Sequence, residues 1–474
     1  MKTFNKGSLT RNTLILLVST LFSHLLSVFL LPVLTYYINP EDFGRYEMIS
    51  SLIPFFYVIF SIQSVEVAFR FLPESNSIDS KKTILTNSLL ISIFGILIFT
   101  PVILILFNSN YLISILIIFL TFSSQVIMNL FLHSARAEER TTLFSVVHLF
   151  VQISTTILNF FFIFFLRLNY IFLLLTPIII NTLVSIFFFL YKPISNLVDF
   201  KFVSLNKIVR YLKFSVPLIP NAILILFTIN IGRFMLLYFF GLSEVGYLSI
   251  SIKFPMLFEV LVSVFLQAWQ VKSIQIKSNP NYKTYLNNVF VRFLRISFSL
   301  LIIFLPLSHL LISHFFSESY RSVLYAIPIF LSAFFLKSLS SFFGILLFSK
   351  SKTFTMLKIS SIYIIFYSII GFFLVQRYGY IGVAITQLII EGLKLVITFM
   401  SVNLNFKFDF KQSHFIILFI LFIISISLFY YQNLLLEIVL IIVSSLLLLF
   451  INFNDFRSVI LNVFNMIEMN KKKS

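Results

Sequence analysis

The sequence contains no cysteine, which excludes disulfide bonds, thiolate metal sites and cysteine nucleophiles. It is also poor in charge: only 11% of its 474 residues are Asp, Glu, Lys or Arg, whereas 59% are hydrophobic. A soluble domain could not cover its surface with so few charged groups, so the solvent around most of this chain must be lipid.

Sequence motifs for catalysis are missing as well. The chain has no Gly-x-x-x-x-Gly-Lys-Ser/Thr phosphate loop, so it does not hydrolyse ATP through that machinery. No cluster of His, Asp and Glu has metal-ligand spacing, and no acid-rich loop resembles the metal site of a glycosyltransferase. We therefore expect no enzymatic activity, no catalytic residue, no metal site and no cofactor.

What the sequence does contain is a long series of apolar runs. The first, Thr13–Ile38, is longer than a signal-peptide core and lacks a small-residue cleavage site, so we interpret it as a spanning helix. Windows of about 20 apolar residues predict about fourteen spans. They cover 12–38, 43–70, 84–107, 111–134, 142–166, 169–191, 210–240, 244–270, 285–310, 321–348, 354–376, 380–403, 412–431 and 434–452.

Lys and Arg outnumber Asp and Glu by 35 to 17, which gives a formal net charge of +18. These cations are concentrated in alternate loops, and the loops between contain only Arg45, Arg167, Arg321 and Arg377. This alternation is the positive-inside pattern of membrane topology rather than a nucleic-acid-binding face. It predicts both termini in the cytoplasm, an even number of spans and no nucleic-acid partner.

The longest polar break between spans, Lys192–Lys213, suggests where two halves join. We predict an all-α polytopic membrane protein with two six-helix lobes, followed by two helices that have no counterpart in the first half. The predicted parts are an N-terminal lobe over 1–191, a cytoplasmic linker over 192–209, a C-terminal lobe over 210–404, and helices 13 and 14 with a basic cytoplasmic tail over 405–474.

A short turn occurs twice, as Asn39–Tyr46 and as Gly241–Tyr247, each time between two apolar runs. In both copies an acid stands two residues before a glycine, and these glycines, Gly44 and Gly246, are 202 positions apart. The repeat favours two similar halves in parallel orientation. We interpret the turn's acids, Glu41, Asp42 and Glu244, as helix-start residues rather than ligands, and expect the glycines to permit close helix packing.

Four cations fall inside predicted spans: Arg233, Lys253, Lys337 and Lys394. A charge at membrane depth costs roughly 2.5–3.5 kcal/mol on insertion scales, so each should face protein, water or a ligand. Arg233 either snorkels to the outer surface or lines a cavity that accepts an anion. Lys253 is either neutralised by an acid such as Glu259 or lines the same cavity. Lys337 is a third cavity cation or the partner of a distant acid.

The acids near these spans suggest gating or ion coupling. Glu391 and Lys394 are three apart and can share a helix face, as a structural ion pair or as a relay. Glu66 and Arg70, four apart, are expected to pair at the inner end of span two. Glu47 is either a gate residue or an acid placed favourably at a helix N-terminus.

Several short stretches resemble a known family. Lys6-Gly-Ser-Leu-Thr-Arg-Asn12, Pro40-Glu-Asp-Phe-Gly-Arg-Tyr46 and Ala68-Phe-Arg-Phe-Leu-Pro-Glu74 are similar to Wzx-type flippases for O-antigen or capsule repeat units. These flippases belong to the multidrug/oligosaccharidyl-lipid/polysaccharide (MOP) exporter superfamily. Ser243-Glu-Val-Gly-Tyr247 and Tyr378-Gly-Tyr-Ile-Gly-Val-Ala384 extend the resemblance to about span twelve.

The resemblance implies a MATE-like fold whose central cavity is lined mainly by helices one, two, seven and eight. It implies alternating access that moves a polyprenyl-diphosphate-linked oligosaccharide from the inner to the outer leaflet of a bacterial cytoplasmic membrane. Anionic membrane lipids, a glycan polymerase and a chain-length regulator are further implied partners. Arg233, Lys253 and Lys337 would then bind the substrate.

Three other functions stay open at this stage. A multidrug exporter of the same superfamily would favour acids over cations in its cavity. A lipid II flippase would share the plan of fourteen spans. A membrane enzyme such as a glycan polymerase usually needs a large outer loop with catalytic residues, and no such loop is found in the sequence.

Overall fold

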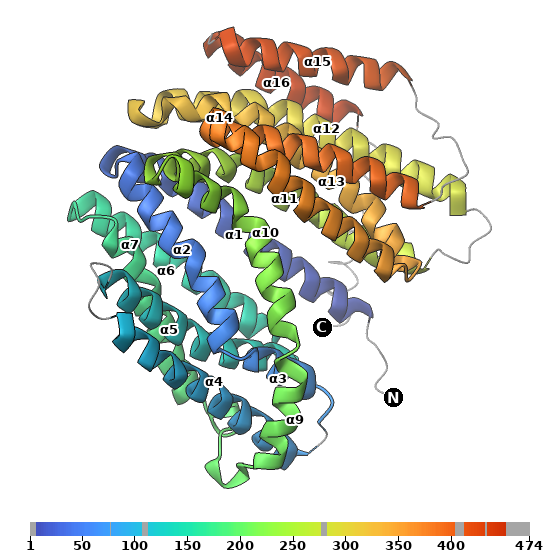
Figure 1. Cartoon of the computed structure of the whole chain (residues 1–474). Coiled ribbons are helices and arrows are strands. Elements are labelled where there is room, and N and C mark those ends of the chain that lie inside the picture. The colour runs from blue at the N-terminus through green and yellow to red at the C-terminus, as the bar shows by residue number, and fades with distance from the viewer. Residues whose placement is uncertain are drawn as a thin grey trace, which may run out of the picture. The chain divides into compact units, whose positions relative to one another are not determined.

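The computed structural model describes residues 6–75, 77–106, 112–275, 282–402, 412–431 and 434–451 (Figure 1). These residues form helices and connecting turns, with no strand among them, which confirms the predicted all-α class. Their contacts divide the chain into two compact units, Met1–Ser249 and Ile250–Ser474. Residues 452–474 of the predicted basic tail lie outside the described residues.

The first unit contains the helices up to the start of α11. They are α1 (Lys6–Tyr37), α2 (Pro40–Phe60), α3 (Ser64–Phe71), α4 (Ile78–Leu106), α5 (Leu112–Ala137), α6 (Thr141–Phe160), the π-helical turn η1 (Phe161–Phe165), α7 (Ile171–Leu190), α8 (Lys192–Ser195), the 3-10 turn η2 (Phe200–Phe202), α9 (Leu205–Ser215) and α10 (Leu218–Phe239). The unit boundary falls inside α11 (Leu242–Gln275) rather than in the predicted linker. The two six-helix lobes therefore stay a prediction.

The second unit contains the rest of α11 and the helices that follow it. They are α12 (Tyr282–Phe315), η3 (Glu318–Tyr325), α13 (Ile327–Ser349), α14 (Thr353–Val402), α15 (Gln412–Tyr431) and α16 (Leu434–Ile451). Within α14, Gly379 has φ 56° and ψ −135°, so two helices meet there at a kink. The kink separates the two spans predicted over 354–376 and 380–403.

Among the described residues, nine helices are long and apolar enough to cross a membrane, or ten if the bent pair α2–α3 is one span. Three shorter apolar helices, Leu21–Tyr37, Ile416–Ser427 and Leu435–Leu446, come in addition. The chain is therefore a multi-pass membrane protein. The count of fourteen spans stays a prediction.

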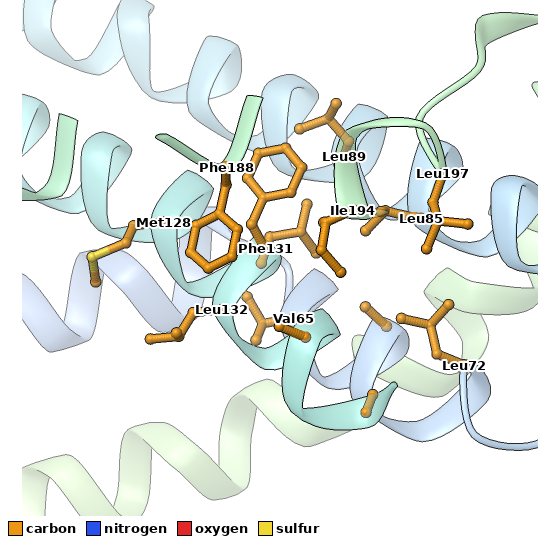
Figure 2. Close-up of a cluster of buried hydrophobic side chains, with 14 of the residues drawn as sticks. Val65, Leu72, Leu85, Leu89, Met128, Phe131, Leu132, Phe188, Ile194 and Leu197 are labelled. Carbon is orange, nitrogen blue, oxygen red and sulfur yellow. The ribbon is translucent and has the colours of Figure 1, made fainter. Parts of the chain in front are cut away.

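A cluster of buried side chains holds the first unit together (Figure 2). Phe131 of α5 and Phe188 of α7 stack with ring centroids 6.1 Å apart. On α3, Val67 and Ala68 are completely buried in the same cluster. Lipid offers no hydrophobic driving force between helices, so close packing of this kind must supply much of their association.

The second predicted span, 43–70, is broken in the structure. Helices α2 and α3 meet at an angle of 62°, and the break is at Ile62 and Gln63, whose φ angles are +50° and +53°. A positive φ is a strained conformation for a β-branched residue, so the surrounding packing must enforce it. Gly95 of α4 supports the break, because an added Cβ there would lie 1.8 Å from the Phe60 carbonyl oxygen.

The predicted linker over 192–209 is folded and held against α4. Lys82 Nζ lies 3.1 Å from Asp199 Oδ2, and the Thr86 hydroxyl accepts a hydrogen bond from the Asp199 backbone at 2.9 Å. The Asn87 side chain donates to the Phe202 carbonyl at 3.1 Å and accepts from the Ser204 backbone at 3.0 Å. We call this contact between α4 and 199–204 the linker latch. It fixes the start of α9, which leads into α10 (Figure 1).

Candidate functional site

The two copies of the repeated turn contact each other directly. A Cβ added at Gly44 would lie 1.8 Å from the Leu242 carbonyl oxygen, and one added at Gly246 would lie 2.1 Å from the Pro40 carbonyl oxygen. The first turns of α2 and α11 therefore touch backbone to backbone. Only glycine allows this approach, which confirms the prediction of close packing. We call this contact the glycine crossing.

The acids at the start of α2 behave as predicted from the sequence. The Asn39 side chain caps the helix by accepting from the Asp42 backbone N–H at 2.8 Å. Glu41 and Asp42 stand in the first turn, where they pair with Arg45 at 3.1 and 3.7 Å. These contacts confirm Glu41 and Asp42 as helix-start residues.

A buried ion pair follows the glycine crossing along α2, because its acid, Glu47, is three residues after Gly44. Arg233 Nη2 of α10 is 3.5 Å from Glu47 Oε2, and the two side chains are only 15% and 9% exposed. Arg233 Nη1 also donates to Asn230 Oδ1 at 3.0 Å. The pair is the first candidate site, because isolated charges at this depth would be costly and removal of either one leaves the other buried alone.

The Arg233 guanidinium retains binding capacity. Its Nε is buried and has no hydrogen-bond partner among the described residues. A guanidinium has five N–H donors in a planar fork that matches carboxylate and phosphate oxygens. Arg233 is thus held by one long ion-pair contact to Glu47 and one hydrogen bond to Asn230, and its Nε–H remains available to a further acceptor. The structure answers one open question: Arg233 pairs inside the protein rather than snorkelling outward.

In the second unit, Lys337 and Glu259 form another ion pair. Lys337 Nζ of α13 is 2.7 Å from Glu259 Oε1 of α11, and the side chains are 32% and 38% exposed. Of the two interpretations of Lys337, the structure supports a distant acidic partner. Glu259, considered from the sequence as a partner of Lys253, pairs with Lys337. Lys253 itself is half-buried on α11.

The predicted pair on the second half of α14 is confirmed. Lys394 Nζ is 3.4 Å from Glu391 Oε2. Gln387 donates to Glu391 at 3.2 Å and to the Tyr363 hydroxyl at 3.2 Å. Lys394 Nζ also lies 5.1 Å from the centre of the Tyr363 ring. Tyr363 and Lys394 line an apolar pocket of about 100 Å³. Glu391 is 1% exposed, which fits a structural network.

The pair predicted between Glu66 and Arg70 is wrong. Arg70 forms its ion pair with Glu74, one turn further along, and the Arg70 guanidinium also lies over the Phe71 ring. Both pairings have the same spacing of four, so spacing alone could not choose between them. Glu66 is exposed on α3, and gating by Glu66 and Arg70 stays a prediction.

Sequence reasoning missed one pair altogether. His309 of α12 and Glu437 of α16 approach to 2.7 Å, with side chains 4% and 1% exposed. Glu437 lies near the start of the predicted span 434–452, and an acid inside an apolar run is the signal that marks such a position.

Comparisons with known proteins identify the family of this chain. Residues 9–270, more than half of the chain, match the family model described as "Polysaccharide biosynthesis protein". A comparison with curated proteins gave no match.

Three solved structures with the same fold are distant in sequence. The lipid II flippase MurJ in an inward closed conformation is 16% identical, with a TM-score of 0.67 over 93% of this chain and 98% of that one. An inward-facing multidrug resistance MATE family transporter of the MOP superfamily is 13% identical, with a TM-score of 0.64 over 81% and 94%. A mutant of the Vibrio cholerae MATE transporter VcmN is also 13% identical, with a TM-score of 0.55 over 84% and 96%. The chain thus shares the fold of these flippase and transporter structures, and it belongs to the polysaccharide biosynthesis protein family.

Proposed function

We propose that the protein is a Wzx-type flippase, which moves polyprenyl-diphosphate-linked oligosaccharide repeat units from the inner to the outer leaflet of a bacterial cytoplasmic membrane. The observation that carries the proposal is the buried Glu47–Arg233 pair, which lies within the part of the chain matched by the polysaccharide biosynthesis family. A substrate of this class combines a lipid tail, a diphosphate and a bulky glycan. The diphosphate is the part that needs a cation inside the membrane.

Arg233 is suited to exchange one anion for another. The 3.5 Å contact to Glu47 is long for an ion pair, and the Nε–H of Arg233 has no acceptor among the described residues. Diphosphate oxygens could accept from the guanidinium in the bidentate manner that phosphate prefers. Displaced from Arg233, the Glu47 carboxylate would then take up a proton or move toward water.

The exchange is reversible. When the diphosphate leaves on the outer side, the Glu47 carboxylate returns to Arg233 and gives up any proton it had taken up. In this scheme Lys253 and Lys337 are further contacts for the anionic groups of the substrate, and Glu391 with Lys394 stabilises the second unit.

The test replaces the pair in the cell that makes the glycan. Arg233→Gln is expected to abolish surface glycan, with lipid-linked oligosaccharide accumulating on the cytoplasmic side at normal protein level. Arg233→Lys should retain a small part of the activity, because a lysine keeps the charge and loses the planar fork. Glu47→Gln should weaken export at least tenfold, and Lys253→Ala should also block it.

The matched control is Arg45→Gln, since Arg45 also pairs with acids on α2 but is 41% exposed. Glycan output of this variant should equal that of the wild type. Wild-type glycan in both Arg233→Gln and Lys253→Ala would refute the proposed binding role of these cations.

Similarity to MurJ favours one second candidate, a flippase for lipid II. It would use the same polyprenyl-diphosphate chemistry, so variants of Arg233 cannot separate the two. Complementation of a strain depleted of its lipid II flippase separates them. Growth would support lipid II, whereas restored surface glycan in a strain lacking only its repeat-unit flippase supports our proposal.

A further inference from the structure

Helix α9 leads into α10 (Figure 1) and extends it beyond the length that a membrane span requires. The two helices together, Leu205–Phe239, are 35 residues long, about 52 Å at the rise of an α-helix. The hydrocarbon core of a bilayer is about 30 Å thick, and α10 with its 22 residues is long enough to cross it. The 11 residues of α9 therefore reach into the headgroup layer on the predicted cytoplasmic side.

One side of α9 is apolar and yet exposed. Leu205, Val209 and Val216 are 76%, 51% and 48% exposed, and their spacings of four and seven place them along one side of the helix. Another side packs on the protein: Tyr211 is 4% exposed, and its ring centre is 5.3 Å from that of Phe71 on α3. The exposed apolar side is left open to the surroundings, which for a membrane protein are lipid.

A row of cations runs beside this apolar side. Lys207, Arg210 and Lys213 follow each other at intervals of three and are exposed, and α9 contains no acid. Among the described residues no acid forms an ion pair with any of the three, whereas Asp199, the acid before α9, pairs with Lys82. Positive charge without counter-ions, next to exposed apolar side chains, fits a partner that is both apolar and anionic.

The Arg210 guanidinium is held in place at this surface. Its carbon atom lies 5.7 Å from the centre of the Phe71 ring, and the guanidinium of Arg70 on α3 lies 6.0 Å from the same centre. A cation–π contact orders the side chain and leaves its N–H donors available. An ordered guanidinium loses less freedom when it binds, so Arg210 is prepared to donate to phosphate oxygens.

We propose that the exposed side of α9 is a binding surface for the anionic phospholipids of the cytoplasmic leaflet. Arg210 and Lys213 are eight and five residues before the start of α10, about 12 and 8 Å along the helix, within reach of lipid phosphates. Val216, next to α10, would contact the acyl chains. Three cations spread along α9 fit several headgroups of a leaflet better than a single diphosphate. The inference requires only that the chain spans a membrane, and it does not depend on the substrate proposed above.

Quenching of a local fluorophore by brominated lipids measures the lipid preference of this surface. The full-length protein, free of other cysteines, carries a bimane label on Val216→Cys in vesicles of phosphatidylcholine and phosphatidylglycerol. Bromine is placed on the acyl chains of one lipid at a time, and the ratio of the two quenching efficiencies gives the preference. One Lys or Arg near an anionic surface strengthens attachment about fivefold. We therefore expect a preference for phosphatidylglycerol of at least about fivefold, which should fall as salt screens the charges.

Substitutions of the cations test which residues cause this preference. R210Q and K213Q should each lower it about fivefold, and R210K should retain most of it, because lysine keeps the charge. R140Q is the matched control. Arg140 is exposed in another loop of the predicted cytoplasmic side and donates to the Tyr191 hydroxyl at 2.8 Å. Its removal takes the same charge from a different surface, so the preference measured at Val216 should not change.

Three results would overturn the proposal. The first is equal quenching by the two lipids in the protein without cation substitutions, and the second is an effect of R140Q as large as that of R210Q. The third is displacement of the brominated phosphatidylglycerol by a trace of polyprenyl diphosphate, since the surface would then select a substrate-like lipid. None of these results depends on whether the protein exports a glycan, so the surface and the proposed transport function can fail separately.

Discussion

At the scale of single residues, local spacing predicted one of the two ion pairs expected within a helix, and it could not predict the ion pairs between helices. Glu391 and Lys394 are three apart, and the expected pair is present. Glu47 and Arg233 are 186 positions apart, so no helical period relates them. The sequence marked Arg233 as a cation at membrane depth and Glu47 as a gate residue or a helix-start acid, and only the fold shows that they form a pair.

The glycine crossing gives a prediction at this scale. Gly44→Ala or Gly246→Ala places a methyl group about 2 Å from a backbone carbonyl oxygen, and backbone cannot rotate away as a side chain would. Overpacking of this kind costs about 1–3 kcal/mol. We expect the thermal unfolding midpoint of either purified variant to fall by several degrees.

Gly344→Ala is the internal standard for that experiment. An added Cβ at Gly344 of α13 meets nothing within 4 Å, and alanine is favoured over glycine in a helix by about 1 kcal/mol. Its midpoint should stay level or rise. Equal losses at Gly44 and Gly344 would show that the crossing does not constrain the helices.

At the scale of elements, apolar runs predicted where helices lie but not where they break. The break between α2 and α3 is at Ile62 and Gln63, a stretch without glycine or proline. The signal lies elsewhere in the chain, at Gly95, whose missing side chain admits the Phe60 carbonyl. The linker was likewise expected from its polarity, while its attachment to α4 depends on side chains more than one hundred positions away.

The linker latch should loosen in acid. The backbone N–H of Lys201 and then the Lys82 ammonium hold the pKa of Asp199 below its ordinary value of 3.8. A carboxylate with a lowered pKa stabilises the folded state above the ordinary value and loses this effect as the pH falls through the lowered one. A spin label on Val203→Cys should therefore become more mobile only below about pH 4.

The chain lacks cysteine, so this label needs no background changes. Asp199→Asn should show raised mobility at neutral pH and no further change in acid. Lys81→Gln is the matched control, because Lys81 lies next to Lys82 but pairs with Glu138 at 2.6 Å. Identical spectra for Asp199→Asn and the wild type at pH 7 would contradict the role of the latch.

At the scale of the whole molecule, composition was sufficient to predict a membrane protein, and the family resemblance was sufficient to predict the fold. Scarce charge and a mean hydropathy of +1.02 require lipid, and solved structures of MOP superfamily transporters share the arrangement of helices. The exact number of spans is harder to predict, because the described residues of α15 and α16 contain only short apolar cores and α14 joins two helices without a loop.

Topology can be measured with single cysteines. Ser319→Cys in η3 should react with a membrane-impermeant maleimide on intact spheroplasts, since its loop is predicted to lie outside. Asn206→Cys in α9 should react only after lysis, and both positions are exposed. A fusion reporter at the C-terminus should report a cytoplasmic position, like Asn206→Cys. A reporter on the outer side would mean that an odd number of spans, rather than an even number, follows Asn206.

The glycine crossing also indicates how the chain evolved. Gly44 meets Leu242 while Gly246 meets Pro40, and both members of each equivalent pair, Gly44 with Gly246 and Pro40 with Leu242, are 202 positions apart. Such reciprocity is what a twofold symmetric homodimer shows at its axis. A chain of half this length could already have formed the contact by pairing with its own copy. Gene fusion would then have inherited this interface, and later divergence could change everything around the two glycines while leaving them in place.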